Sequence, residues 1–283
     1  MAKKGNRTVI ITGAGQGIGQ AIAFRFAADG SNIVIVSKDS PAQIKETIEG
    51  IESAGGKALA LEVDIRSNDE LKKIVDETVA HFGSIDVLVN NTSAPCFSDA
   101  LHTSPEQFDL IISTSMRAAF FLAQISFPHL KEAKNPHIIN IAPPIGLEMQ
   151  WLRDHLPFSL GKYGMSLCTL GMSAEFKNAG IAVNSLWPQT NIATQRLKDH
   201  LSPQVYAGSR WPSIMADAAY ELARRTYQEA TGQFFIDETL LRESGISDFS
   251  RYAVDPTQPL VQTLFLPLRE GMIPISRELF RFK

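Results

Sequence analysis

The chain has 283 residues, 44% of them hydrophobic and 20% charged, which is long enough for one large domain with a well-buried core. Its net charge of -3 provides no basic surface for nucleic acid, and Met1 to Arg7 is too polar for a signal peptide or membrane span. The two cysteines, Cys96 and Cys168, have neither metal-binding nor redox spacing. We therefore expect a soluble cytoplasmic protein without a metal site.

Strands and helices alternate along the chain. In its first half, hydrophobic periodicity predicts a strand at 9–11, a helix at 21–26, a strand at 32–37, a helix at 42–53, a strand at 58–63, a helix at 69–82 and a strand at 85–90. Ser104, Pro105 and Glu106 are typical of a helix start, and a long helix is predicted at 108–130. The second half predicts a strand at 137–142, a helix at 158–177, a strand at 181–186, a helix at 216–225 and a last strand at 232–236.

This order of elements predicts an α/β fold of the Rossmann type: a doubly wound, seven-stranded parallel sheet with helices on both faces. We expect this domain to occupy residues 1–250. Residues 251–283 form a C-terminal extension in which prolines interrupt an apolar run, too broken for a long helix and too apolar to remain in water. The extension is therefore expected to pack on the cleft of its own subunit or on a neighbouring subunit.

A glycine-rich turn, from Thr12 to Gly19, lies between the first strand and the first helix. Backbone amides that open a helix can hold a diphosphate only where no side chains intervene, so the turn indicates a dinucleotide site. The motif alone fits a simple tight turn equally well, because glycine is common in turns. The second strand, at 32–37, follows at the distance of a parallel crossover and favours the dinucleotide interpretation.

Four motifs together resemble the short-chain dehydrogenase/reductase family over residues 7–245. They are Thr12-Gly13-x-x-x-Gly17-x-Gly19, Asp64 after the third strand, Asn90-Asn91 after the fourth, and Lys162 on a late helix. The chain is similar to the hydroxysteroid dehydrogenase-like branch of this family in Ala142-Pro143-Pro144, Lys162 to Ser166, Trp187-Pro188, Ala216 to Tyr220 and Phe235 to Glu238. The resemblance implies binding of a nicotinamide dinucleotide, an oxidoreductase activity, and a substrate lid at 192–215.

The resemblance also implies which residues hold the dinucleotide. They are Gly13, Gly15, Gln16, Gly17, Ile18, Gly19, Ser37, Lys38, Asp64, Ile65, Asn91, Lys162, Pro188, Thr190 and Ile192. An acidic side chain at the end of the second strand would select NAD by accepting hydrogen bonds from both ribose hydroxyls, but this chain has Ser37 and Lys38 there. We therefore expect NADP. NAD stays open, because Asp39 follows and Lys38 also fits a simple surface lysine.

The expected catalytic positions depart from the family pattern. In the family, a tyrosine four residues before the helix lysine transfers the hydroxyl proton while a hydride passes between the nicotinamide and a carbonyl carbon. That position is Phe158 here, the carbonyl-polarising serine falls at Ala142 or Pro143, and the proton-relay asparagine falls at Ser115. A phenyl ring, a methyl group and a proline cannot donate a proton. Of the expected set, only Lys162 keeps its chemistry.

Three functions stay open. The first is a protein that binds NADP(H) and whose carbonyl or alcohol oxidoreductase activity is weak or lost. The second is an active enzyme on a hydrophobic carbonyl or alcohol with an altered proton donor, for which His155, three residues before Phe158, is the candidate because histidine titrates near neutrality. The third is a fold that has lost the nucleotide as well. In this family dimers and tetramers are common, so we expect a homodimer or homotetramer.

Overall fold

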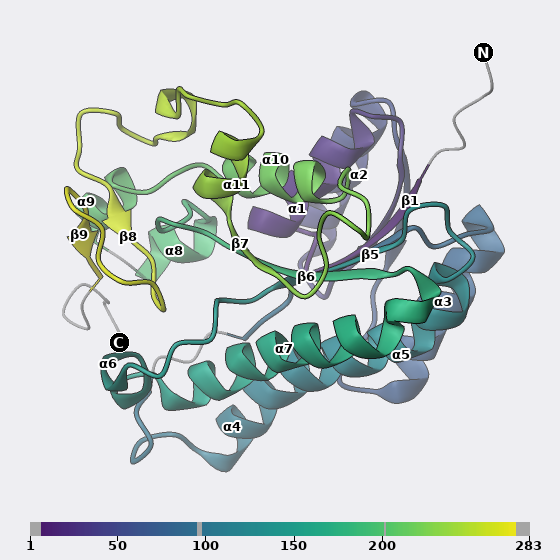
Figure 1. Cartoon of the computed structure of the whole chain (residues 1–283), viewed down its shortest axis with the longest axis horizontal. Helices are drawn as coiled ribbons and strands as arrows, with labels where there is room; N and C mark the ends of the chain where they lie inside the picture. Colours follow the sequence, from purple (N-terminus) through teal and green to yellow (C-terminus); the bar gives the residue numbers. More distant parts are fainter. Residues whose placement is uncertain (1–6, 95–97, 201, 276–283) are drawn as a thin grey trace.

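The computed structural model describes residues 7–94, 98–200 and 202–275 of the chain (Figure 1). Cys96, residues 1–6 and residues 276–283 of the C-terminal extension lie outside the described residues. Cys168, half-buried on a helix, carries a free thiol.

A parallel sheet of seven strands forms the centre of the molecule. The strands are β1 (Thr8–Thr12), β2 (Asn32–Val36), β3 (Lys57–Leu61), β4 (Val87–Asn90), β5 (His137–Ile141), β6 (Ala182–Trp187) and β7 (Phe234–Ile236). Their order is β3-β2-β1-β4-β5-β6-β7, and every neighbouring pair is parallel. The doubly wound sheet predicted from the sequence is therefore confirmed.

Helices cover both faces of the sheet (Figure 1). One face carries α1 (Gly17–Ala27), α2 (Pro41–Ser53) and α10 (Ser213–Leu222), and the other carries α3 (Asn68–Phe82), α5 (Ala118–Leu130) and α7 (Leu156–Glu175). Successive side chains of β1 point to opposite faces, so Val9 and Ile11 pack in one hydrophobic core and Ile10 in the other. This burial on both faces explains why the strands read as continuous apolar runs.

The helix predicted at 108–130 is interrupted. The chain forms α4 (Pro105–Ile112), a π-helical turn (Ser113–Arg117) and then α5. Ser104 caps α4 as predicted: its hydroxyl accepts from the backbone amide of Gln107 at 3.2 Å, and Pro105 occupies the first turn. By length and composition, the whole stretch Pro105–Leu130 could cross a membrane, but its α5 part packs against α3 and α7 as a core helix of the sheet layer.

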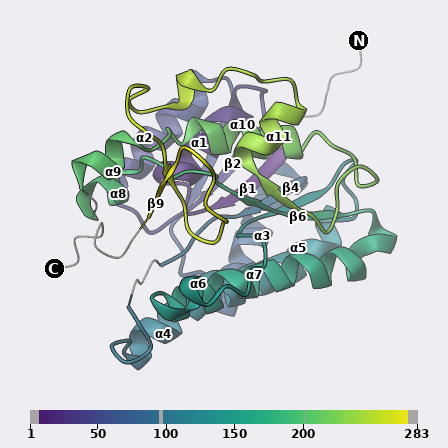
Figure 2. The same cartoon turned by 60° about the vertical axis from the view of Figure 1, so that its left-hand side comes forward.

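Short elements that the sequence analysis did not predict gather at the carboxyl end of the sheet. They are α6 (Met149–Arg153), α8 (Gln195–His200), α9 (Pro203–Ala207), α11 (Asp237–Glu243), β8 (Val261–Gln262) and β9 (Ile273–Pro274). In Figure 2 the strand β9 and the helices α8 and α9 lie above α6, at one end of the molecule. These short elements form a cover over the carboxyl ends of the strands.

Candidate dinucleotide and catalytic site

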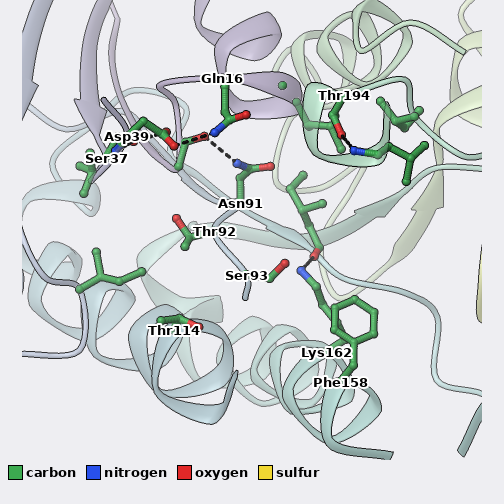
Figure 3. A pocket seen from close by; sticks show the side chains of 18 of the residues that line it. Gln16, Ser37, Asp39, Asn91, Thr92, Ser93, Thr114, Phe158, Lys162 and Thr194 are labelled. Carbon is green, nitrogen blue, oxygen red and sulfur yellow. Dashed lines mark hydrogen bonds between the residues drawn. The ribbon is translucent and has the colours of Figure 1, made fainter. Parts of the chain in front are cut away.

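A cavity of about 590 Å³ opens at the carboxyl ends of the strands (Figure 3). It is centred where the strand order reverses between β1 and β4, which is the ligand-binding position of doubly wound sheets. Its lining comes from the glycine turn, the ends of β2, β3, β5 and β6, helix α7 and the C-terminal extension. The size is typical of a pocket for one cofactor-sized ligand.

The glycine turn leaves the start of α1 bare. Gly13 and Gly17 have left-handed φ angles of 68° and 61°. A Cβ atom on Gly19 would lie 2.3 Å from the carbonyl oxygen of Gly13, so only glycine fits this close approach. The first turn of α1 contains no acidic residue that would neutralise the positive end of the helix dipole and repel a bound anion. The observed cradle therefore fits a diphosphate group.

An acidic side chain lies beside this turn. Asp39 accepts a 2.7 Å hydrogen bond from the amide of Gln16 and another from the hydroxyl of Ser37. A Cβ atom on Gly15 would lie 2.5 Å from the Asp39 carboxylate. Gly15 therefore makes room for Asp39 and does not itself line the cavity.

Two cations share Asp64 at the same end of the cavity. The Lys38 ammonium lies 3.0 Å from the Asp64 carboxylate, and Arg66 forms a two-armed contact with the same group. The hydrogen bond from Arg66 holds the pKa of Asp64 well below its ordinary value. Arg66 lines the cavity, but the sequence analysis missed it because no motif marks it.

Asn91 ties the loop after β4 to the glycine turn. Its side-chain amide donates to the carbonyl of Thr12 at 2.9 Å, and its backbone amide donates to the Thr12 hydroxyl at 3.0 Å. The next amide, from Thr92, donates to the same hydroxyl at 3.0 Å. Three bonds to one residue therefore fix the two loops that border the strand reversal.

Lys162 is buried at the far end of the cavity, on α7. Its ammonium donates a 2.8 Å hydrogen bond to the carbonyl of Ile141 and lies 5.7 Å from the centre of the Trp187 ring. The side chain is 2% exposed, and burial lowers the pKa of Lys162 to about 7. Among the described residues no carboxylate lies within 4.0 Å of this ammonium.

Phe158 lies one helical turn before Lys162 and also lines the cavity. The other predicted catalytic positions do not. Ala142 is buried against Met165, Ser115 is buried beside α7, and His155 precedes the first turn of α7 in a buried position. The described residues that line the cavity include no tyrosine and no histidine.

Most predicted dinucleotide contacts reach the cavity. Those that line it are Gly13, Gln16, Gly17, Ile18, Ser37, Lys38, Asp64, Ile65, Asn91, Lys162, Pro188 and Ile192. Gly15, Gly19 and Thr190 do not line it, and Thr190 is wholly buried, forming a bridge to Gln262. Lining residues that the sequence analysis did not assign to the site include Arg66, Thr92, Ser93, Thr114, Asn191, Thr194, Thr263 and Leu264.

Comparison with known proteins places this architecture among described families. A model of the short chain dehydrogenase family matches residues 7–203. Hydroxysteroid dehydrogenase-like protein 2 is 42% identical over 265 residues in Danio rerio and 43% identical over 265 residues in Xenopus laevis, covering 92% of this chain in each case. The chain spans only 63% of the length of these relatives. A crystal structure of a putative dehydrogenase from Xanthomonas campestris is 44% identical, with a TM-score of 0.88, over 93% of this chain and 98% of that one.

Proposed function

The chain belongs to the short-chain dehydrogenase family, in its hydroxysteroid dehydrogenase-like branch, and from this we propose that it binds a nicotinamide dinucleotide while its carbonyl or alcohol oxidoreductase activity is weak or lost. The observation that carries the proposal is one pair of neighbours on α7. Lys162 lines the cavity as a holder of the dinucleotide would, whereas Phe158 presents a phenyl ring at the position expected for tyrosine.

The residues of the cavity fit each part of the dinucleotide. The amides of the glycine turn and of the start of α1 would hold the diphosphate. Ser37 and Lys38 would face the adenosine ribose, and the Lys162 ammonium would bind the hydroxyls of the nicotinamide ribose. When bound, the reduced nicotinamide supplies a hydride; the protein must supply the proton that accompanies it.

The groups expected to donate the proton and to bind the carbonyl oxygen are replaced in this chain. An unperturbed tyrosine has a pKa of about 10, and the lysine beside it brings that value toward the working pH. Removing a positioned acid costs roughly 10²–10⁴ in rate, and removing one donor to the carbonyl oxygen costs roughly 10²–10³. With Phe158 and Ala142 at those positions, even the smaller losses in rate would leave the activity of an ordinary reductase barely measurable.

NADP(H) is the preferred dinucleotide in this proposal. Lys38 and Arg66 both line the cavity and pair with Asp64, and a 2′-phosphate bound beside them would compete with Asp64 for the two cations. Asp39 also lines the cavity, but its two oxygens already accept hydrogen bonds from Gln16 and Ser37, which leaves fewer acceptor positions for ribose hydroxyls.

One observation favours the second candidate function, an active NADP-dependent oxidoreductase on a hydrophobic carbonyl or alcohol. In Figure 3 the hydroxyl of Ser93 points toward the ammonium of Lys162, and both residues line the cavity. A hydroxyl placed there could pass a proton from the ammonium to a substrate oxygen. His155 does not line the cavity, so it is the weaker candidate for this task.

The test is a titration with NADPH and NADH, followed by the quenching of tryptophan fluorescence, and then an assay with a panel of carbonyls and alcohols. Trp187 lines the cavity and should report binding directly. Tight binding without turnover supports the proposal. Robust turnover that is lost in Ser93→Ala would establish the second candidate instead, and turnover lost in His155→Ala would assign the proton to histidine.

We also propose that the protein is cytoplasmic and assembles into a homodimer or homotetramer. The outer faces of α5 and α7 expose large apolar side chains: Phe120, Leu160, Leu167 and Leu170. The three leucines fall on one side of α7 at helical spacing. An exposed patch of this kind on adjacent helices favours contact with a second copy of the chain.

A further inference from the structure

The C-terminal extension returns to the cavity as a short strap, residues 261–266. The strap begins at β8, which pairs with β9, and Gln262 forms a bridge to Thr190. The backbone amide of Thr263 donates to the carbonyl of Gln189 at 3.2 Å. These bonds place the strap against the segment that follows β6.

Two residues of the strap form part of the cavity wall. Thr263 and Leu264 line the cavity together with Lys162 and Trp187. The indole of Trp187 donates a 2.9 Å hydrogen bond to the carbonyl of Leu264. The strap therefore closes the end of the cavity where the nicotinamide half of a dinucleotide would lie.

Phe265 anchors the strap by its ring. The ring is 3% exposed and stacks on that of Phe158, with centres 6.0 Å apart and planes inclined by 24°. Three more rings surround it: Trp151 at 6.4 Å, Tyr163 at 5.2 Å and Trp187 at 5.9 Å. The rings of these four residues form a socket for Phe265, and the socket joins α6, α7 and the end of β6 to the strap.

The backbone of Phe265 is strained. Its φ angle of 68° is left-handed, and Phe265 is the one non-glycine residue in the described part of the chain with such an angle. Strain of this kind persists only where the surroundings hold it in place, and it is frequent at clamps and switches. Here the ring and its aromatic neighbours help to hold the strained backbone, so loss of the ring would loosen the strap.

The far end of the strap is also secured. The side-chain amide of Gln262 donates to the carbonyls of Leu266 and Pro267, each at 2.8 Å, and its oxygen accepts from the backbone amide of Arg269 at 2.7 Å. The Arg269 guanidinium lies 2.8 Å from the buried carboxylate of Glu238. The turn after the strap is therefore fixed by side chains at both ends.

We propose that the strap is a clamp on the nicotinamide half of the dinucleotide and that Phe158 is the floor on which the clamp closes. The dinucleotide enters and leaves when Phe265 lifts from its socket, and any apolar ligand that is to reach Lys162 beside a bound nicotinamide must displace the strap. The ring at position 158 thus has a binding task that needs no hydroxyl. This inference rests on the proposed dinucleotide binding.

The dissociation rate of NADPH, followed by stopped flow through the fluorescence of NADPH itself on the full chain, tests the clamp. Phe265→Ala and Phe158→Ala should each raise the rate at least about tenfold. Leu268→Ala, whose side chain is 58% exposed just beyond the strap, is the matched control and should stay within about twofold of the unaltered protein. Trp187→Phe keeps a ring but removes the bond to Leu264, and should give an intermediate rise.

Unchanged dissociation in folded Phe265→Ala would overturn the clamp while leaving dinucleotide binding intact. If Phe265→Ala does not fold, the rate of Trp187→Phe decides in its place, and no rise there overturns the clamp. If the unaltered protein binds neither NADPH nor NADH, the proposed function fails instead. In that case acrylamide quenching of tryptophan fluorescence tests whether the strap is closed. Quenching should be greater in Phe265→Ala than in Leu268→Ala, and equal quenching would contradict a closed strap.

Discussion

The ammonium of Lys162 is bonded to the main-chain carbonyl of Ile141 at 2.8 Å, and the residue is almost wholly buried. A charge in this position costs stability, because the folded protein holds it away from water and lowers its pKa to about 7. The cost is present in full below pH 7, where the folded state must carry the charge, and it fades as the pH rises toward the ordinary lysine value.

Lys162→Met should therefore unfold less readily in the absence of dinucleotide. We expect a gain on the order of 1–3 kcal/mol in the free energy of unfolding at pH 7, narrowing as the pH rises toward 10. The same variant should bind NADPH about tenfold more weakly, because a charged donor to the ribose is lost. Urea denaturation and fluorescence titration measure the two effects. Lys45→Met, altered on the exposed surface of α2, should change neither.

Restoring hydroxyls should create activity, and loosening the strap should add to it. Phe158→Tyr with Ala142→Ser returns the expected proton donor and carbonyl donor, and should raise the rate of NADPH oxidation with a carbonyl panel by about 100-fold or more. Adding Phe265→Ala should raise it further by admitting larger carbonyls. If the double variant stays as inactive as the unaltered protein while still binding NADPH, the missing hydroxyls are not what limits the reaction.

Lys38 should set the preference for NADP. Lys38→Ala removes a half-exposed cation at the end of β2, and we expect NADPH to bind roughly three- to tenfold more weakly while NADH is unaffected. The ratio of the two dissociation constants, measured at low and at moderate salt, checks this. An equal loss for both dinucleotides would mean that Lys38 acts through Asp64 and the adenosine pocket instead.

Asp237 should make the protein less stable as the pH rises. It is wholly buried, and burial raises its pKa to about 6, so the folded state binds its proton more tightly than the unfolded state does. The resulting stability is present below pH 4 and is lost as the pH rises to 6. Asp237→Asn keeps the oxygen that accepts from Gln189, and should gain about 1–2 kcal/mol in the free energy of unfolding at pH 7.

Thermal unfolding at a series of pH values between 4 and 8 measures the effect. Asp76→Asn, on the exposed side of α3, is the control and should follow the unaltered protein. A constant difference between Asp237→Asn and the unaltered protein over this range would contradict the titration of Asp237.

The apolar face of α7 should carry the subunit contact. Leu167 is 61% exposed, and Leu167→Glu should shift the molecular mass in solution toward the monomer, because a charge in an apolar interface is costly. Light scattering after gel filtration measures the mass. Cutting the chain after residue 255 tests the extension in the same way, and an unchanged mass there together with a monomeric Leu167→Glu would assign the contact to the helices alone.

The sheet could be predicted because each strand is buried on both faces. A strand such as β2, Asn32–Val36, consists of four apolar residues in a row after its first residue, and this pattern does not depend on distant parts of the chain. The π-helical turn at Ser113–Arg117 could not be predicted in this way. It changes the register of backbone hydrogen bonds within a continuous apolar run and leaves the composition unaltered.

The candidate site, like the fold, could be predicted from the sequence only in part. The glycine turn, Asp64 and Lys162 follow strands or sit on a long helix, so their motifs mark them in the sequence. The contact between Trp187 and Leu264 joins residues 77 positions apart, and the socket of Phe265 draws on α6, α7 and β6 at once. No local pattern announces such an arrangement, so the extension could only be expected to cover a cleft or a neighbouring subunit.

Glu238, 2% exposed, receives guanidinium groups from three stretches of chain: Arg210 in the predicted lid, Arg242 on α11, and Arg269 beyond the strap. Withdrawing one partner would leave a buried charge with less compensation. The segment predicted as a lid and the turn after the strap are thus joined through a single buried carboxylate, so a change that displaces one of them would weaken the ion pairs that hold the other.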